Sequence, residues 1–516
     1  MSFLISMLAA GVLVLSATAT AQAPSDPILS RIVRIATDSS HLHPLAHTLL
    51  DSLGPRLTGT PDADRASDWL VRQYRSWNID ARKETTGTWR SWRRGHSHID
   101  LVFPRVRTLE GLMLGYSPGT GGKDVIASTI ILPQFPDSNA FVRWLPQARG
   151  KLVLVSPPKP TCRPVENWVE FGTEQSRRAL ARSLDSLNSE WTSRNIRGTG
   201  YNLALGGGDL GLRMEKAGIA GLITSRAKDA WGTFEVFETY NTRAPAIALS
   251  CEDYGLVYRL TESGAGPRLK LNLDAQLLGE RPVFNTIATI RGVENPDEYV
   301  MLSSHFDTWD GASGATDNGT GTLMMMEAMR ILKQVYPRPK RTIISGHWTT
   351  EEQGAHGSKA FAEDHPEVVK GLQALFNQDN GTGRVRGLHG AGLPDAASHL
   401  TSWLLQLPEG FRSSISYSAP GRLAGRGSDD AAFACYGAPA FTFGSLGWSY
   451  GSYTWHTNRD TYDKVVFDDL KWNAALAAMM VYLASEDPTL ATRELAEGLS
   501  LPVCPPAARK TEPRLR

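Results

Sequence analysis

The chain has 516 residues, of which 41% are hydrophobic and 21% are charged. This composition is typical of folded globular proteins and excludes wholesale disorder, and the length predicts two to four domains. The 54 lysines and arginines nearly cancel the 53 aspartates and glutamates. The resulting net charge of +1 argues against a nucleic-acid partner, which normally requires a basic face.

The cysteines are too few for a disulfide-based scaffold in a chain of this length. They are Cys162, Cys251, Cys435 and Cys504. None belongs to a C-x-x-C pair, which argues against a zinc ribbon with thiolate ligands. Up to two bridges could form, and their pairing stays open at this point.

The N-terminus has the pattern of a secretory signal peptide. The run from Phe3 to Leu15 is apolar or small throughout, and it is shorter than the roughly 20 residues of a spanning helix. An A-x-A site follows and predicts cleavage after Ala23, so that residues 1–23 are removed. No lysine or arginine precedes Arg31, which keeps an uncleaved anchor as the alternative. We expect a secreted or periplasmic protein without stable membrane insertion.

Residues 27 to about 90 are predicted to form helices and a turn. The segment GPRLTGTP marks the turn. Ala66, Trp69, Leu70 and Tyr74 then follow at i, i+3, i+4 and i+8, which is the spacing of an amphipathic helix.

Short apolar strands are predicted between 150 and 280, in GKLVLVSPP, GLITS and APAIALS. The polar, Arg- and Ser-rich stretch 160–200 is predicted to form helical excursions or a loop. Gly206, Gly208 and Gly211 match the dinucleotide fingerprint G-x-G-x-x-G, but no complete βαβαβ unit can be drawn after them. We interpret them as a glycine-rich loop before a helix.

From residue 283 onward strands and helices alternate. The predicted strands are NTIATIRG, EYVMLSSHF, RTIISGHWT and LQALFNQD, and the predicted helices are GTLMMMEAMRILKQVY and FAEDHPEVVKG. This order predicts a three-layer α/β fold with a mostly parallel sheet flanked by helices, and ligands beyond the carboxyl ends of the strands. The tail after Pro502 is rich in proline, lysine and arginine, and we expect it to be mobile.

Acidic and imidazole side chains recur at the predicted strand ends and in glycine-rich loops. They are His305, Asp307, Asp317, Glu351, Glu352, Asp379 and His456. Because parallel strands bring their carboxyl ends to one edge of the sheet, these residues can converge there. Two imidazoles and three carboxylates suit zinc. His347, His356 and His389 are assigned no ligand role.

The donors exceed the three protein ligands that a mononuclear catalytic zinc uses: they are His305, Asp317, Glu352, Asp379 and His456. Two ions roughly 3.5–4 Å apart need a bridging carboxylate, and Asp317 in its D-N-G loop suits that position. Two cations also lower the pKa of a shared water. Glu351 is then available to take the water's proton and return it to the leaving amine. Asp307 can accept the second ring N–H of His305.

The motifs HFDTWD, ATDNGTG, WTTEEQGAHGS and TWHTNRDTYD resemble those of the co-catalytic zinc peptidases of clan MH, which include bacterial leucyl aminopeptidases and carboxypeptidase Q. The resemblance implies that His305 and Asp379 hold one zinc, that Glu352 and His456 hold the other, and that Asp317 bridges them. It implies Glu351 as general base and Asp307 as the partner of His305. In this sequence Ser428-Asp429-Asp430 stands where many relatives have S-D-H, so local substrate contacts can differ.

The resemblance also implies a domain arrangement. The catalytic domain would comprise 24–120 and 276–490, with a β-rich protease-associated domain inserted at 121–275 and a flexible tail at 491–516. Four tryptophans flank the proposed ligands, and they either line a substrate pocket or pack around the metal site: Trp309, Trp348, Trp448 and Trp455.

The sequence thus predicts an exported exopeptidase, an aminopeptidase or dipeptidase, with two Zn²⁺ per chain and a peptide as substrate. A glutaminyl cyclase-like acyl transferase with a single zinc is one alternative. A receptor-like binding module without catalysis is the other. The cleaved residue and the oligomeric state, a homodimer included, stay open.

Overall fold

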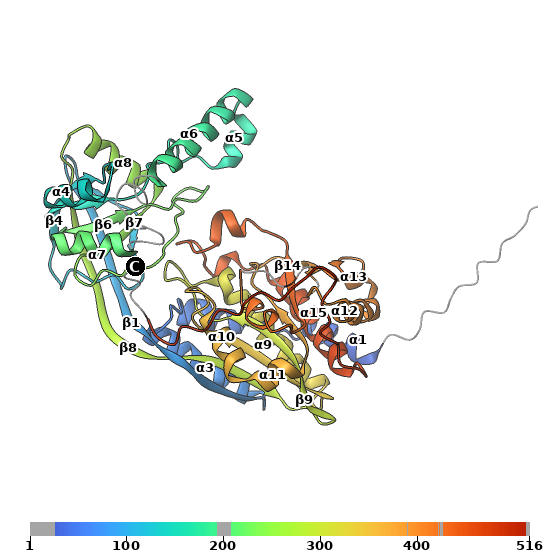
Figure 1. The fold of residues 1–516 in the computed structure, drawn as a ribbon. Coiled ribbons are helices and arrows are strands. Elements are labelled where there is room, and N and C mark those ends of the chain that lie inside the picture. The colour runs from blue at the N-terminus through green and yellow to red at the C-terminus, as the bar shows by residue number, and fades with distance from the viewer. Residues whose placement is uncertain (1–25, 193–207, 390, 422, 424–426, 512–516) are drawn as a thin grey trace, which may run out of the picture.

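The computed structural model describes residues 26–192, 208–389, 391–421, 423 and 427–511. The predicted signal peptide lies outside the described residues. Two lobes are joined by two long strands, β1 (Asp80–Phe103) and β8 (Arg268–Ile290), which pair antiparallel along their length (Figure 1). We call the elements before β1 and after β8 the main lobe and those between them the inserted lobe. None of the described helices has both the length and the apolar character needed to cross a bilayer.

The strand β1 differs from the sequence prediction, which extended helices and a turn to about residue 90. The helix α3 (Pro61–Ser76) is confirmed, but the chain turns into a strand at Asp80. The segment DARKETTGTWRSWRRG has no regular alternation of apolar and polar residues, so no local pattern indicated a strand. The segment becomes a strand because it pairs with β8, which lies nearly 200 positions away along the chain.

The main lobe is built on a sheet in which the strands follow the order β13-β12-β14-β11-β9-β10-β8. Its other strands are β9 (Asn295–His305), β10 (Arg341–Trp348), β11 (Leu372–Asn377), β12 (Val385–His389), β13 (Ser416–Ser418) and β14 (Ala440–Ser445). The neighbours β10, β9, β11 and β14 run parallel, as predicted. At the edge of the sheet formed by β12 and β13 the strand directions are mixed, because β12 pairs antiparallel to β14 and parallel to β13.

Helices cover both faces of this sheet. Successive residues of β9 point to opposite sides, so Val300 and Leu302 join one apolar cluster while Met301 joins another. The first cluster includes α1 (Pro27–Asp38), α2 (Leu42–Ala46), α9 (Thr320–Val335), α12 (Pro394–Gln406), α13 (Glu409–Arg412) and α15 (Phe467–Glu486). The second includes α10 (His356–Asp364), α11 (Pro366–Gly371) and α14 (Ala431–Ala434). The predicted three-layer α/β architecture is confirmed.

One predicted helix of the main lobe is divided in the structure. The segment FAEDHPEVVKG contributes to both α10 and α11, and the break lies at His365. The residue before a proline is disfavoured in helical conformation, so Pro366 ends the first helix and begins the second.

The inserted lobe has its own sheet, in which β4 (Val125–Ile131), β5 (Leu152–Leu154), β6 (Gly221–Thr224) and β7 (Ala246–Leu249) run parallel. The short strand β3 (Gly111–Met113) pairs antiparallel with β7, and β2 (Arg107–Thr108) pairs with β1. The helices α4 (Ser138–Ala148), α7 (Gly208–Ala217) and α8 (Cys251–Glu262) accompany them. We expected a β-rich insertion. The lobe instead alternates strands and helices, because parallel neighbours need crossover connections.

The boundaries of the inserted lobe are wider than 121–275 at one end. Its apolar core extends from Ile99 to Leu273, since β1 carries the chain into it before residue 121. The polar stretch 160–200 contains α5 (Val165–Phe171) and α6 (Glu174–Thr192), which project as an arm (Figure 1). Gly208 and Gly211 lie at the start of α7, whereas Gly206 is outside the described residues.

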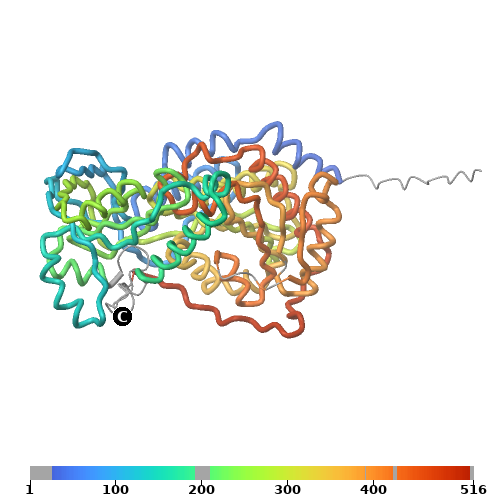
Figure 2. Tube along the Cα trace, turned by 90° about the horizontal axis from the view of Figure 1, so that it is seen from above, coloured from blue at the N-terminus to red at the C-terminus, as the bar shows by residue number. Residues whose placement is uncertain are grey.

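The C-terminal tail is anchored as far as Thr511, contrary to the mobility that we expected. The structure forms two disulfides, Cys162–Cys251 and Cys435–Cys504, and the second fixes the tail to the main lobe. The backbone N–H of Thr88 in β1 donates to the carbonyl of Arg509 (2.8 Å), and the Arg509 guanidinium pairs with Glu363 and Asp364 of α10. Figure 2 shows the tail, in red, running along the main lobe toward the inserted lobe. All these partners are distant in sequence, so the composition of the tail did not indicate them.

Removing the Cys435–Cys504 disulfide by alanine substitution of both cysteines is expected to lower the free energy of unfolding of the main lobe. The bridge closes a loop with a sequence separation of 69, and such a cross-link typically contributes about 2–4 kcal/mol. Urea unfolding followed by tryptophan fluorescence measures the loss. Hydrogen exchange at the Thr88 amide is expected to become faster in this variant but not in the Cys162→Ala/Cys251→Ala control. Equal exchange in all three proteins would contradict the anchoring of the tail.

Candidate metal centre

Three neighbouring parallel strands deliver acidic and imidazole side chains to the same edge of the main sheet. The strand β9 ends at His305, β10 is followed by Glu351 and Glu352, and β11 is followed by Asp379. The register places His305 opposite Trp348 at the end of β10. Chain segments that are far apart in sequence therefore meet at one rim, as the parallel sheet predicts.

The structure brings the five expected ligands together in two overlapping groups. His305, Asp317 and Asp379 form one, and Asp317, Glu352 and His456 form the other, with one potential ligand atom of each residue within 4.8 Å of the others in its group. His305 Nε2 lies 3.2 Å from Asp317 Oδ1 and 3.2 Å from Asp379 Oδ1. His456 Nε2 lies 3.2 Å from Asp317 Oδ2 and 2.9 Å from Glu352 Oε2. Asp317 is shared, and it directs one oxygen toward each imidazole.

These residues fit zinc ions. Each group offers one imidazole and two carboxylates, a nitrogen and oxygen donor set that zinc accepts with room for a further ligand. Glu352 Oε1 is buried and has no hydrogen-bond donor among the described residues. Buried carboxylate oxygens without donors are costly unless a cation compensates their charge. The arrangement therefore suits two cations that share Asp317.

The electrostatics of the cluster point the same way. Burial raises the pKa of Glu352 to about 7, although His456 partly opposes this shift. Burial lowers the pKa of His456, but attraction to Glu352 and Asp317 outweighs it and brings the value to about 10. Burial also raises the pKa of Glu351 well above its ordinary range. These shifts follow from the crowding of acidic groups in a buried site, and because metal ligands must be deprotonated, metal binding is expected to release protons.

Asp307 contacts His305 differently from what the sequence suggested. The ring nitrogen Nδ1 of His305 bonds to the backbone carbonyl of Asp307 at 2.9 Å, whereas the carboxylate lies 3.9 Å away. That carboxylate instead accepts from the backbone N–H groups of Glu351 (3.1 Å) and Glu352 (3.3 Å), and from the Thr58 hydroxyl (3.0 Å). A proton on Nδ1 leaves the Nε2 lone pair facing Asp317 and Asp379. Asp307 thereby orients the turn that carries both glutamates.

Two buried residues that the sequence analysis missed hold the loops around the site. Asp460 accepts from the Thr316 N–H and hydroxyl (both 2.8 Å) and from the Asp317 N–H (3.0 Å). Arg56, in the predicted turn, donates to the carbonyls of residues 54, 306, 313 and 314 at 2.8–3.1 Å. Burial lowers the pKa of Arg56 to about 10, which still leaves it charged at neutral pH. The only sequence signal was the aspartate that follows His456 in TWHTNRD, to which no role was given.

Aromatic rings surround His456, and one comes from the inserted lobe. The rings of Trp455 and His456 stack at 3.7 Å, and Trp309 and Phe237 meet the imidazole edge-on. Phe237 was missed because it lies in the insertion, more than 200 positions before His456. Of the other predicted tryptophans, Trp348 is fully buried against phenylalanines of the second cluster, and Trp448 is 59% exposed.

The three histidines that were assigned no ligand role, and the segment Ser428-Asp429-Asp430, lie outside the two ligand groups. The His347 ring lies 2.7 Å from the Tyr74 hydroxyl, and burial lowers its pKa to about 3. Neither His347, His356 nor His389 belongs to a potential metal group among the described residues. Asp429 and Asp430 are buried, and burial raises the pKa of Asp429 to about 8.

Replacing Asp460 by asparagine is expected to weaken zinc binding about 10–100-fold, the usual effect of removing a group that orients a ligand. The new amide would present a donor to N–H groups that already donate, and the Asp317 loop would lose its support. Competition with a chromogenic chelator measures the affinity, with Asp463→Asn, an exposed neighbour in the next turn, as control. Unchanged zinc affinity in Asp460→Asn would show that Asp460 does not position Asp317.

Comparison with known proteins extends these observations. Residues 285–481 match the model of Peptidase family M28. Carboxypeptidase Q from Homo sapiens is 25% identical over 348 residues, and the rat protein is 26% identical over 349 residues. These matches cover 67% of this chain and 65% of each relative, so the chain spans slightly less than two thirds of their length.

Solved structures share the fold. A Peptidase M28 precursor from Shewanella amazonensis superposes with a TM-score of 0.65 at 21% identity, covering 91% of this chain and 98% of that one. A zinc aminopeptidase from Bacillus subtilis gives a TM-score of 0.57 at 18% identity, covering 88% and 96%. The central sheet flanked by helices is thus the fold of M28 aminopeptidase structures. The motifs and the site geometry agree with these matches, and residues 285–481 are similar to peptidase family M28.

Proposed function

We propose that this chain is an exported, zinc-dependent exopeptidase that holds two zinc ions and removes a residue from a chain end, with the amino end preferred. The observation that carries the proposal is the shared carboxylate of Asp317, which directs one oxygen toward each of two imidazoles. Each imidazole has a second carboxylate beside it, Asp379 or Glu352. Two complete ligand groups are therefore available.

The protein residues have separate roles in this proposal. When bound, the zinc ions would polarise the peptide carbonyl and make a water molecule more acidic. Glu351 follows Thr350 at the same rim and is left free of the ligand groups, so its carboxylate takes the proton from the attacking water and delivers it to the leaving amine. Asp307 keeps Glu351 in place through the backbone N–H. Phe237, together with Trp309 and Trp455, excludes water from one side of His456.

The relatives support the reaction class. The curated relatives are named carboxypeptidase Q, and one structural neighbour is titled a zinc aminopeptidase. Both names describe exopeptidases, whereas a glutaminyl cyclase would leave His305 and Asp379 without a metal to hold. Export is supported by the two disulfides, which persist in oxidising compartments.

The test combines metal analysis with product analysis. Purified protein is expected to contain two zinc ions per chain and to shorten a defined peptide mixture by single residues, read by mass spectrometry. A chelator should abolish the activity, and added zinc should restore it. One zinc per chain with cyclisation of N-terminal glutamine would favour the cyclase. A protein that binds no zinc and leaves every peptide intact would contradict the proposal.

A further inference from the structure

A large cavity in the inserted lobe has no part in the proposed chemistry. Its volume is about 510 Å³, which lies in the range of small-molecule and peptide sites. It opens at the carboxyl ends of β5 and β6, the position at which α/β sheets commonly bind ligands. The arm that was an unexplained polar stretch in the sequence forms one wall, through Leu184 and Leu187 of α6.

The cavity adjoins the candidate metal centre. Phe237 lines it, and the ring of the same residue lies 5.1 Å from the His456 ring, edge to face. The backbone N–H of Val236 donates to the His456 carbonyl (2.9 Å). Lys228, which also lines the cavity, places its ammonium group 4.7 Å from the Trp455 ring that stacks on His456. The cavity and the metal centre are thus neighbours, with aromatic rings between them.

The walls combine apolar surface with positive charge. Leu114, Val155, Leu187 and Tyr254 contribute the apolar part. Among the described residues, three cations and one acid line the cavity, and two of the cations, Arg226 and Lys228, pair with that acid, Glu235, at 2.6 Å. The third cation is Lys159, whose ammonium group lies 3.5 Å from the exposed carboxylate of Asp229 and 3.4 Å from the carbonyl of Lys228. The lining therefore favours a ligand that carries a negative charge.

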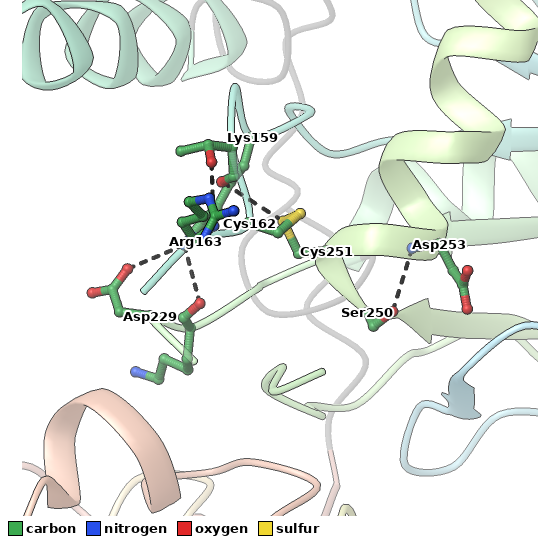
Figure 3. Close-up of a disulfide and its surroundings, with 9 residues drawn as sticks. Lys159, Cys162, Arg163, Asp229, Ser250, Cys251 and Asp253 are labelled. Atoms are coloured by element: carbon green, nitrogen blue, oxygen red, sulfur yellow. Dashed lines mark hydrogen bonds and ion pairs between the residues drawn. A yellow bond between two sulfur atoms is a disulfide. The ribbon is translucent and has the colours of Figure 1, made fainter. Parts of the chain in front are cut away.

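A disulfide tethers the loop that follows Lys159. The disulfide Cys162–Cys251 joins the loop after Lys159 to the first residue of α8, and Cys251 itself lines the cavity. Figure 3 shows the bridge beside Lys159 and Asp229. Helix α8 is capped there by Ser250, whose hydroxyl accepts from the Asp253 N–H. A pre-positioned charge loses less entropy on binding than a mobile one.

We propose that this cavity is a remote subsite that binds an apolar, carboxylate-bearing part of the peptide, beyond the bond that is cleaved. The proposal rests on the proposed exopeptidase function and extends it by naming a substrate class. Lys159 is the specificity-determining cation, and Leu187 and Tyr254 contact the apolar side chain. The carboxylate has two possible sources, the free C-terminus of a short peptide or an acidic side chain.

Three tripeptides separate these sources in the zinc-loaded enzyme: Leu-Gly-Leu, its C-terminal amide, and the amide of Leu-Gly-Glu. The free acid is expected to have a kcat/KM about tenfold above its amide, because one charge-assisted contact is lost in the amide. If kcat/KM for Leu-Gly-Glu amide is as high as for the free acid, the subsite binds acidic side chains. If it is as low as for Leu-Gly-Leu amide, the subsite binds the C-terminal carboxylate. Equal values for all three peptides would overturn the proposal.

Variants assign the effect to Lys159. In Lys159→Ala protein, kcat/KM for the free acid Leu-Gly-Leu is expected to fall to the value for its amide. The kcat/KM for the amide is expected to stay within twofold of the wild-type value. Lys216→Ala, which removes an exposed lysine of α7 that does not line the cavity, is the matched control and should change neither. If Lys159→Ala retains the tenfold preference, Lys159 does not bind the carboxylate and the proposal fails.

Binding measurements keep the subsite testable apart from catalysis. Isothermal titration of Glu351→Gln protein with Leu-Gly-Leu and with its amide should give dissociation constants about tenfold apart, and Lys159→Ala should remove the difference. Carboxylate-dependent binding without any hydrolysis by the wild type would refute the exopeptidase function and leave the subsite standing. Hydrolysis without such binding would refute the subsite alone.

Discussion

Glu351→Gln protein is expected to retain its zinc and to lose activity by about 10²–10⁴-fold in kcat, the range attributed to general acid–base catalysis. The amide keeps the size of the carboxylate but cannot accept the proton of the attacking water. Glu351 belongs to neither ligand group, so the metal content should stay at the wild-type value. Initial rates on a leucyl peptide and zinc analysis of the same sample provide the measurement.

The matched control is Glu409→Gln, which makes the same chemical change on an exposed residue of α13. It is expected to leave both kcat and zinc content unchanged. A Glu351→Gln enzyme with full activity would refute the role of Glu351 as general base. A variant that loses zinc together with activity would instead place Glu351 among the ligands.

Asp317→Ala protein is expected to lose both zinc ions and more than about 10³-fold of the activity, because Asp317 is the only residue common to the two ligand groups. Each group would keep one imidazole and one carboxylate, fewer protein ligands than catalytic zinc sites use. The number of zinc ions per chain, measured by mass spectrometry after gel filtration, gives the loss of zinc directly.

Asp379→Ala is the informative comparison, since it removes a ligand from the first group only. It is expected to retain about one ion, held by Asp317, Glu352 and His456. Two ions in Asp317→Ala protein would contradict a shared carboxylate. Equal losses in both variants would show that the two ions bind cooperatively rather than in separable groups.

The sequence determined the α/β alternation of the main lobe and the set of candidate ligands. His305, Glu352 and Asp379 lie at or just after strand ends and Asp317 lies in a glycine-containing turn, so a short window was enough to recognise these motifs. The helices α3 and α9 were likewise predictable, because the apolar residues of α3 recur at helical spacing and α9 is a long apolar run that ends just before Pro337. Parallel strands then imply a common edge, which is why residues from His305 to His456 could be expected to converge.

Only the tertiary structure decided which other residues hold the candidate metal ligands in place. Asp460, Arg56 and Phe237 each contact partners that are 143 or more positions away along the chain, and no local pattern encodes such pairs. The strand β1 and the anchored tail follow the same rule, since their polar sequences gain order from β8, α10 and a disulfide. Local periodicity reports which face of an element is buried, whereas the identity of the partner depends on how the whole chain packs.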